Sequence, residues 1–340
     1  MDPINAPDDR TVLRVHDLVV RLEVEGRRAH AVDGVDLELR RGETLALVGE
    51  SGCGKSLTAL AVLRLLPRPV AGIARGRIEY GDLDLVTAAP AALRRVRGGE
   101  IAMIFQEPMT SLNPVFSCGE QIAEVARLHL GLGRRAARDR AVGLMEQVGI
   151  DRPAERARQL PHELSGGMRQ RVMIAMALAG EPKALLADEP TTALDVTTQA
   201  QILDLLDRLR EEFSLAVLLV THDLALAAER AQRVAVMYAG RIVETGPCTA
   251  VFAAPAHPYT LGLLACRPVL GRRQESLPAI EGQVPDVFER PPGCSFHPRC
   301  PFSVERCRTD EPGASEIDPG HATACFEHDA VLRKGAWTDA

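Results

Sequence analysis

The feature that most constrains this chain is a glycine-rich loop, GESGCGKS, at residues 49–56. The apolar run TLALVG leads into the loop and the apolar run LTALAVLRLL follows it, so the loop connects a buried strand to a helix. Glycines let backbone N–H groups converge on phosphates, and the start of the following helix adds a favourable dipole. The order strand, loop and helix therefore predicts an α/β fold that opens with a P-loop for a nucleotide.

Two side chains of this loop have specific expected roles. Lys55 is expected to reach the β- and γ-phosphates, and Ser56 to coordinate Mg²⁺. The other residues supply the backbone around the phosphates: Gly49, Glu50, Ser51, Gly52, Cys53 and Gly54. A chance glycine-rich turn is the alternative, and the flanking strand and helix argue against it.

A second apolar run, ALLADEP, predicts a buried strand that ends at Asp188. A carboxylate at this position can support Mg²⁺ through Ser56 or a water molecule. Glu189 follows directly and is placed to polarise the water that attacks the γ-phosphate. An Asp-Glu pair after a strand is usually a helix cap or a surface pair, but the P-loop in the same chain favours the catalytic interpretation.

The segment LSGGMRQ, residues 164–170, precedes an apolar helix. Ser165, Gly166 and Gly167 present a hydroxyl and unhindered backbone N–H groups to an anion. Taken alone, Ser-Gly-Gly is a weak signal and is more often an ordinary helix N-cap with a flexible lead-in.

In this order, the P-loop, LSGGMRQ and ALLADEP resemble the nucleotide-binding domain of ABC ATPases, over roughly residues 10–250. The resemblance implies that Gln106 senses Mg²⁺ and the membrane subunits, that Asp195 lies in a loop crossing a dimer interface, and that His222 contacts the γ-phosphate. It also implies a head-to-tail dimer, with ATP between the P-loop of one copy and Ser165–Gly167 of the other. Without this context, Gln106 would be a solvated strand end, and His222-Asp223 a cap of the next helix.

One family feature has no match in this chain. An aromatic residue usually stacks on adenine upstream of the P-loop, and VVRLEVEGRRAHAV contains none. Leu22 and His30 are the candidate substitutes.

Several segments resemble the ATPase subunits of bacterial dipeptide and oligopeptide importers. They are EPMTSLNP (107–114), LSGGMRQRVMIAMALAGEP, HPYTLGLL (257–264), Val284-Pro285 and PPGCSFHPRCPF. The resemblance implies an ATPase that energises peptide uptake with two transmembrane permease subunits, an extracytoplasmic substrate-binding protein and a second ATPase, expected to be a paralogue. The expected location is the cytoplasmic face of the cell (inner) membrane, as a peripheral subunit. Importers of nickel and other small solutes share parts of these segments and remain the alternative.

Four cysteines near the C-terminus, Cys294, Cys300, Cys307 and Cys325, have the spacing C-x5-C-x6-C-x17-C. Four thiolates suit a [4Fe–4S] cluster or tetrahedral zinc, and free thiols are the third interpretation. The gaps match neither a ferredoxin run nor a C-x2-C zinc ribbon, whereas similar tails in the importer family carry a [4Fe–4S] cluster. His297 and His321 are alternative ligands.

Bulk properties limit the other function classes. The net charge is −6 and basic residues are interspersed with acidic ones, which argues against nucleic acid as a partner. No apolar run approaches the ~20 residues of a membrane span, and the start MDPINAPDDR does not resemble a signal peptide. A soluble ABC ATPase that acts on ribosomes or DNA is the competing class, but such proteins usually carry two cassettes or a long coiled coil.

The predicted fold is an α/β, P-loop (RecA-like) core with an antiparallel β subdomain, an inserted helical subdomain and a small, loop-rich, cysteine-containing C-terminal domain. We predict that residues 10–107 and 181–255 form the ATP-binding core and that 108–180 form the helical subdomain. Residues 256–340 are predicted to be a separate C-terminal extension.

Overall fold

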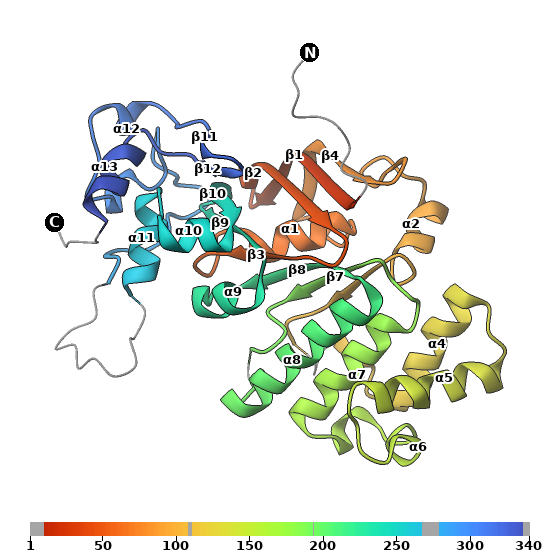
Figure 1. The fold of residues 1–340 in the computed structure, drawn as a ribbon. Coiled ribbons are helices and arrows are strands. Elements are labelled where there is room, and N and C mark those ends of the chain that lie inside the picture. Colours follow the sequence, from red (N-terminus) through yellow and green to blue (C-terminus); the bar gives the residue numbers. More distant parts are fainter. Residues whose placement is uncertain (1–9, 108–110, 193, 267–278, 336–340) are drawn as a thin grey trace. The chain divides into compact units, whose positions relative to one another are not determined.

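The computed structural model describes residues 10–107, 111–192, 194–266 and 279–335 (Figure 1). The chain divides into two compact units, each assembled from separated stretches of sequence. The signature unit, named for LSGGMRQ, comprises Met1–Arg14, Glu38–Glu43 and Glu79–Val220. The P-loop unit comprises Val15–Leu37, Thr44–Ile78 and Thr221–Ala340.

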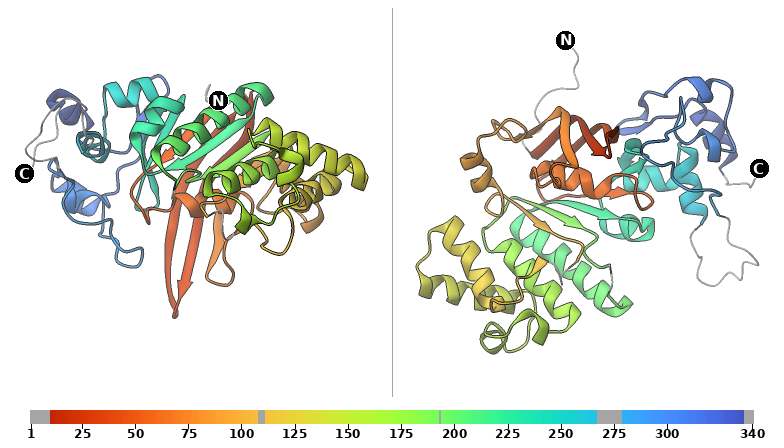
Figure 2. Two further views of the ribbon diagram at one scale, coloured as in Figure 1. Left: turned by 90° about the horizontal axis from the view of Figure 1, so that it is seen from below. Right: turned by 180° about the vertical axis from the view of Figure 1, so that it is seen from behind.

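One sheet has the strand order β2-β1-β4-β5. Its strands are β1 (Thr11–Val24), β2 (Arg27–Arg40), β4 (Ala71–Tyr80) and β5 (Leu83–Asp84). The left view of Figure 2 shows β1 and β2 as a long hairpin. Its turn consists of Glu25 and Gly26, which both have positive φ angles, the conformation that two-residue hairpin turns require. This sheet corresponds to the predicted antiparallel subdomain.

Three parallel neighbours, in the order β6-β7-β8, form the sheet of the signature unit. They are β6 (Ile101–Ile104), β7 (Ala184–Asp188) and β8 (Ala216–Thr221). Every residue of β7 and β8 is buried, as expected for parallel strands covered on both faces. This explains why their sequences are continuous apolar runs without alternation. The strand predicted to end at Asp188 ends there.

The periodicity of apolar residues predicts three helices, at roughly 117–130, 134–149 and 167–180. All three are present, with ends within two residues of these bounds. The helices described in this unit are α2 (Pro90–Val96), α4 (Cys118–Leu130), α5 (Arg134–Gln147), α6 (Pro153–Arg156), the 3₁₀ turn η1 (Pro161–Glu163), α7 (Gly166–Leu178) and α8 (Val196–Phe213). Local signals define the ends of α4: the Ser117 side chain accepts a hydrogen bond from the backbone N–H of Glu120, and Gly131 ends the helix with φ 67°.

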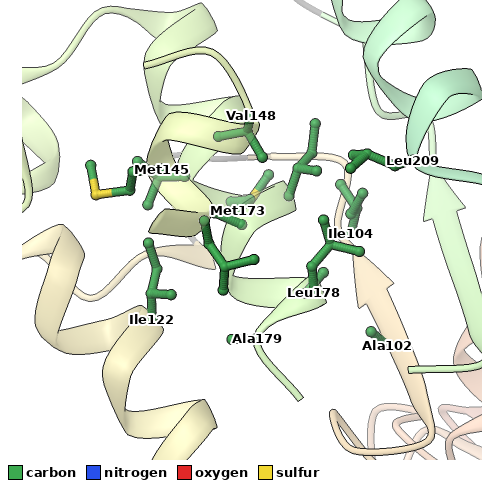
Figure 3. Packing of buried hydrophobic residues seen from close by; sticks show 14 of the residues in the cluster. Ala102, Ile104, Ile122, Met145, Val148, Met173, Leu178, Ala179 and Leu209 are labelled. Carbon is green, nitrogen blue, oxygen red and sulfur yellow. The ribbon is translucent and has the colours of Figure 1, made fainter. Parts of the chain in front are cut away.

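Figure 3 shows the core that holds these helices against the sheet. Ile122 from α4, Met145 from α5 and Met173 from α7 pack together and are each at most 2% exposed. Ile104 of strand β6 and Leu209 of helix α8 belong to the same cluster. The helical segment and the strands therefore share one apolar core within the signature unit.

The sheet of the P-loop unit has the order β3-β9-β10-β12-β11. Its strands are β3 (Thr44–Val48), β9 (Arg233–Tyr238), β10 (Arg241–Pro247), β11 (Ser315–Asp318) and β12 (His321–Thr323). β3 and β9 are parallel, and the remaining pairs are antiparallel. The chain beyond residue 255 thus adds two strands to a sheet that begins with the strand before the P-loop.

The helices of the P-loop unit are short. They are α1 (Lys55–Val62), α9 (Leu224–Arg230), α10 (Cys248–Ala253), α11 (Pro258–Ala265), the 3₁₀ turn η2 (His297–Arg299), α12 (Arg306–Thr309) and α13 (His328–Lys334). Three aromatic residues, Tyr238, Tyr259 and Phe296, pack with β3 and α9 in one buried cluster. Across the described ranges of both units, no helix combines the length and the apolarity that a membrane crossing needs.

The core in Figure 3 yields a stability prediction. Ile122→Ala should destabilise the protein by about 2–5 kcal/mol, because the truncated side chain leaves a cavity at a fully buried position. Leu128→Ala on the same helix is the matched control, since Leu128 is 74% exposed and its loss should change stability by less than about 0.5 kcal/mol. Urea unfolding followed by circular dichroism measures both, and equal losses in the two variants would contradict this account of the core.

Candidate functional site

Close packing against β9 and β2 explains two glycines of the P-loop. A Cβ atom at Gly49 would lie 2.2 Å from the carbonyl oxygen of Met237, and one at Gly54 would lie 2.7 Å from the carbonyl oxygen of Ala31. Gly54 also has a φ of 110°, which side-chain-bearing residues rarely adopt. No other residue fits these positions without moving the backbone, so the loop has one closely defined path.

The ammonium group of Lys55 is held inside this loop. Its Nζ donates to the carbonyl oxygens of Gly49, at 2.8 Å, and Glu50, at 2.9 Å, and the residue is 5% exposed. Ser56 is the next residue of α1 and is half-buried. Cys53 is buried, and burial raises the pKa of its thiol, so Cys53 is a packing residue rather than a reactive thiol.

His222 and Asp223 have separate positions at the end of β8. The Asp223 carboxylate caps α9 by accepting hydrogen bonds from the backbone N–H groups of Ala225, at 2.7 Å, and Leu226, at 3.2 Å. His222 is exposed. The helix cap therefore explains why an aspartate stands at position 223, but it does not explain the histidine at position 222.

In the signature unit, Glu189 lies directly after β7 with its carboxylate held from two sides. The Gln106 side-chain amide donates to Glu189 Oε2 at 3.1 Å, and the Thr192 hydroxyl donates to the same atom at 2.8 Å. Its backbone N–H donates to Val220 at 3.0 Å, with φ at 44°. Asp188, the last residue of β7, is 5% exposed. The structure thus brings Gln106 and Glu189 together beside a buried carboxylate.

Two helix starts meet at the signature sequence. The Ser165 hydroxyl caps α7 by accepting from the N–H of Met168 at 3.3 Å. Asp195 caps α8 by accepting from the N–H and the hydroxyl of Thr198, at 3.0 and 2.7 Å, and the Thr198 hydroxyl lowers the pKa of Asp195. A Cβ atom at Gly167 would lie 2.7 Å from the Thr198 methyl carbon, so the glycine permits this approach.

The predicted site residues therefore form two groups. Lys55, Ser56 and His222 belong to the P-loop unit, and Gln106, Asp188, Glu189, Ser165–Gly167 and Asp195 belong to the signature unit. Sequence reasoning missed Thr192 and Thr198, which orient two of these carboxylates. The run TTALD offered a signal for Thr192, because a hydroxyl three residues after Glu189 can turn back to it.

The four cysteines of the C-terminal extension lie close enough together to affect one another's pKa values. Burial raises the pKa of Cys294 to about 11 and those of Cys300 and Cys325 to about 12, with a further rise from neighbouring cysteines. The backbone N–H groups of Phe296, Phe302 and Glu327 act in the opposite direction and lower these pKa values. The backbone N–H of Cys294 donates to the carbonyl of Cys307 at 2.9 Å, which joins two of the four positions.

Among the described residues, no three His, Cys, Asp or Glu side chains converge closely enough to bind one metal ion. The two candidate histidine ligands have other contacts. His321 Nε2 lies 2.8 Å from Glu244 Oε1 in a buried pair, and His297 Nδ1 lies 3.0 Å from the Cys294 carbonyl. Of the four cysteines, Cys307 is buried and Cys294, Cys300 and Cys325 are half-buried.

Two family models match the chain. The model described as ABC transporter matches residues 32–192, and the model described as oligopeptide/dipeptide transporter, C-terminal region, matches residues 243–307. The first contains the P-loop, LSGGMRQ and ALLADEP, and the second contains three of the four clustered cysteines.

Relatives match over nearly the whole chain. A protein of Brucella abortus (strain 2308) named for peptide import and ATP binding is 51% identical over 326 residues, covering 93% of this chain and 96% of its own. A protein of Sinorhizobium fredii (strain NBRC 101917 / NGR234) named as a peptide ABC transporter ATP-binding protein is 49% identical over 327 residues, covering 96% and 98%.

Solved structures resemble the larger part of the fold. A dimeric, post-hydrolysis ATP-binding cassette, MJ0796, bound to ADP and Pi, is 26% identical with a TM-score of 0.61, covering 69% of this chain and 98% of that one. The protein cbiO1 of Clostridium perfringens, part of the ABC transporter complex cbiONQ, is 27% identical with a TM-score of 0.61, covering 72% and 92%. The predicted fold class is thereby confirmed.

The capping role of Asp223 can be tested apart from any chemistry. Asp223→Ala should destabilise the protein by about 1 kcal/mol, because two N–H groups at the start of α9 lose their acceptor. Asp223→Asn retains a side-chain oxygen and should stay near wild type. Urea unfolding of the pair decides the point: an alanine variant as stable as the asparagine variant would show that the cap contributes nothing.

Proposed function

This chain belongs to the ABC transporter family, and we propose that it is the subunit that hydrolyses ATP to drive the import of dipeptides and oligopeptides. The peptide substrate is supported by relatives of about 50% identity that are named for peptide import and by the match to the transporter C-terminal region. The ATPase activity is supported above all by one observation, the Glu189 carboxylate held at the end of β7 by Gln106 and Thr192.

In this proposal, the P-loop binds the phosphates of ATP. Backbone N–H groups of Gly49–Ser56 donate to phosphate oxygens, and the start of α1 adds a favourable dipole. Lys55 is already fixed inside the loop by two carbonyl oxygens, so its charge meets the β- and γ-phosphates with little reorganisation.

The donor set around the phosphates is appropriate for Mg²⁺, which prefers oxygen ligands. Ser56 supplies a hydroxyl, Asp188 a carboxylate and Gln106 an amide oxygen. When bound, Mg²⁺ neutralises charge that develops on the phosphate oxygens. The buried position of Asp188 keeps its carboxylate at the end of β7, where it cannot rotate freely into solvent.

Glu189 accepts the proton of the water that attacks the γ-phosphate. Gln106 and Thr192 both donate to Oε2, which fixes the rotamer of the carboxylate. His222, exposed at the end of β8, contacts the γ-phosphate and donates to it. Because Thr192 orients the base and is not among the proposed ligands of Mg²⁺ or phosphate, its loss should lower turnover more than ATP affinity.

Two ATPase subunits act together in this scheme. Ser165, Gly166 and Gly167 of one subunit contact the ATP held by the P-loop of the other, and Asp195 lies in the contacting loop. ATP then stabilises the closed dimer because it binds that state better than the open one. A paralogue is proposed as the second subunit.

The remaining partners follow from import. Two transmembrane permease subunits provide the pathway, and an extracytoplasmic binding protein delivers the peptide. The helical segment 108–180, of which 111–180 are described here, is proposed to dock on the permeases together with Gln106. This arrangement makes the chain a peripheral subunit at the cytoplasmic face of the cell membrane.

The proposed base is tested with Glu189→Gln. This variant should bind ATP like wild type but lose at least about 100-fold in turnover, because an amide cannot accept the proton. It should also accumulate as a closed dimer with its partner subunit in saturating ATP. Lys55→Ala is the contrasting variant and should lose ATP affinity itself. ATPase assays, equilibrium binding and size-exclusion chromatography measure these effects, and wild-type turnover in Glu189→Gln would remove Glu189 from the mechanism.

The substrate is tested by uptake in cells that carry the complete transporter. Labelled di- and oligopeptides should accumulate with the wild-type chain and not with Glu189→Gln. Uptake of nickel or another small solute in place of peptide would overturn the peptide assignment and leave the ATPase assignment intact. Hydrolysis that no permease stimulates would instead favour a soluble ABC ATPase.

We also propose that Cys294, Cys300, Cys307 and Cys325 hold a [4Fe–4S] cluster. Four cysteine thiolates supply the number of ligands that such a cluster requires, and a tetrahedral zinc ion is the alternative. A cluster spreads its four thiolate ligands over separate irons, and amide donors to the sulfurs, as at Cys300 and Cys325, stabilise the thiolate form. Its role is structural in this proposal.

Metal analysis tests the cluster. Anaerobically purified protein should contain about four irons and four sulfides per chain, with broad visible absorption. Cys300→Ser should lower the iron content, whereas Cys266→Ser, outside the set, should not. Stoichiometric zinc, or metal-free protein after anaerobic handling, would reject the cluster.

A further inference from the structure

Glu50, the second residue of the P-loop, makes an ion pair with the C-terminal extension. Arg299 Nη1 donates to Glu50 Oε1 at 2.9 Å, and Arg299 Nη2 donates to Oε2 at 3.2 Å. The Arg299 side chain is 6% exposed. Two parallel hydrogen bonds between a guanidinium and a carboxylate fix orientation as well as distance. The Glu50 side chain is 30% exposed, so the arginine is the buried partner of the pair.

The backbone of Glu50 makes a second contact with the extension. Its N–H donates to the hydroxyl oxygen of Tyr259 at 2.9 Å, and Tyr259 is fully buried. The carbonyl of the same residue accepts from Lys55 Nζ at 2.9 Å and from the N–H of Cys53 at 3.3 Å. Glu50 thus connects the extension on one side with the phosphate-binding lysine on the other.

Arg299 is itself held in place by the surrounding residues. Its Nε donates to the carbonyl of Glu281 at 2.9 Å, and its Nη2 donates to that of Ile280 at 3.2 Å. The guanidinium carbon also lies 5.7 Å from the centre of the Tyr238 ring and 5.9 Å from that of Phe296. Because these contacts restrict its rotamers, little entropy is lost when it pairs with Glu50.

Tyr259 is held equally firmly. Its ring lies 4.7 Å from that of Tyr238 and 5.4 Å from that of Phe296. The start of α11 is fixed by Glu244, a buried carboxylate that accepts the N–H groups of Ala256 and His257 at 2.7 and 3.0 Å. The hydroxyl of Tyr259 therefore has a defined position from which to receive the Glu50 N–H.

We propose that Arg299 and Tyr259 are positioning residues of the nucleotide site. The C-terminal extension holds Glu50 by its side chain and by its backbone, and so keeps the carbonyl that orients Lys55 in place. This inference rests on the proposed function only for its consequence, a higher ATP affinity. We call the contacts of Arg299 and Tyr259 with Glu50 the brace of the loop. The brace is present in the free protein, so its effect on the loop can be measured without nucleotide.

Hydrogen–deuterium exchange in the full chain tests the brace directly. Without nucleotide, Arg299→Ala should speed the exchange of amides in the peptide that contains residues 50–55 by roughly tenfold or more, since loss of a bidentate ion pair with a buried arginine frees the loop. Arg306→Ala is the matched control, because Arg306 is an exposed arginine of the same extension. Unchanged exchange in Arg299→Ala would overturn the proposal.

A double-mutant cycle tests the route through Glu50. ATP affinity should fall about tenfold in Arg299→Ala, recover in part in Arg299→Lys, and show no further loss when Arg299→Ala is added to Glu50→Ala. An equal loss in the Glu50→Ala background would mean that Arg299 acts through general folding or through the cysteines, and would overturn the proposal.

Tyr259→Phe removes one hydroxyl and keeps the ring, so it provides the second variant if Arg299→Ala does not fold. It should speed exchange at residues 50–55 at an unchanged melting temperature, and wild-type exchange would count against the proposal. Absence of ATP binding in the wild-type chain would refute the proposed function, while the exchange measurement would still decide the brace.

Discussion

A buried ammonium group imposes the main physical constraint on this protein. Lys55 is nearly excluded from water, and a charge in that position is tolerated only when hydrogen-bond acceptors surround it. The carbonyls of Gly49 and Glu50 provide them, which requires the loop to curl tightly against β9. The glycines of the loop, the path of β9 and the contacts of Glu50 with the extension all serve this geometry.

Sequence reasoning was most successful where short-range physics decides the outcome. Continuous apolar runs predicted the buried strands that end beside the P-loop and at Asp188, and periodicity predicted the three helices of the signature unit. The pairing of Gln106 with Glu189 was not deducible from spacing, since 83 residues separate them. Glu189 was assigned from its position after a buried strand in a chain with a P-loop, and Gln106 from the resemblance to a family. The structure adds that the two side chains are hydrogen-bonded.

The contacts that were missed join distant parts of the chain. Arg299 and Glu50 are 249 residues apart, and Tyr259 and Glu50 are 209 apart, so no local period or motif links them. The pairing of β12 with β10 likewise depends on tertiary packing, because a three-residue strand carries almost no pattern of its own. In the segment EPMTSLNP (107–114), which resembles peptide importers, residues 108–110 lie outside the described residues.

The backbone at Glu189 carries a further consequence. A φ of 44° places a side-chain-bearing residue in the left-handed region, at a cost of about 1–3 kcal/mol. Glycine would relieve that strain but has no carboxylate to accept a proton. The most stable residue at this position is therefore not the functional one, and evolution toward a more robust fold and toward faster turnover would favour different amino acids here.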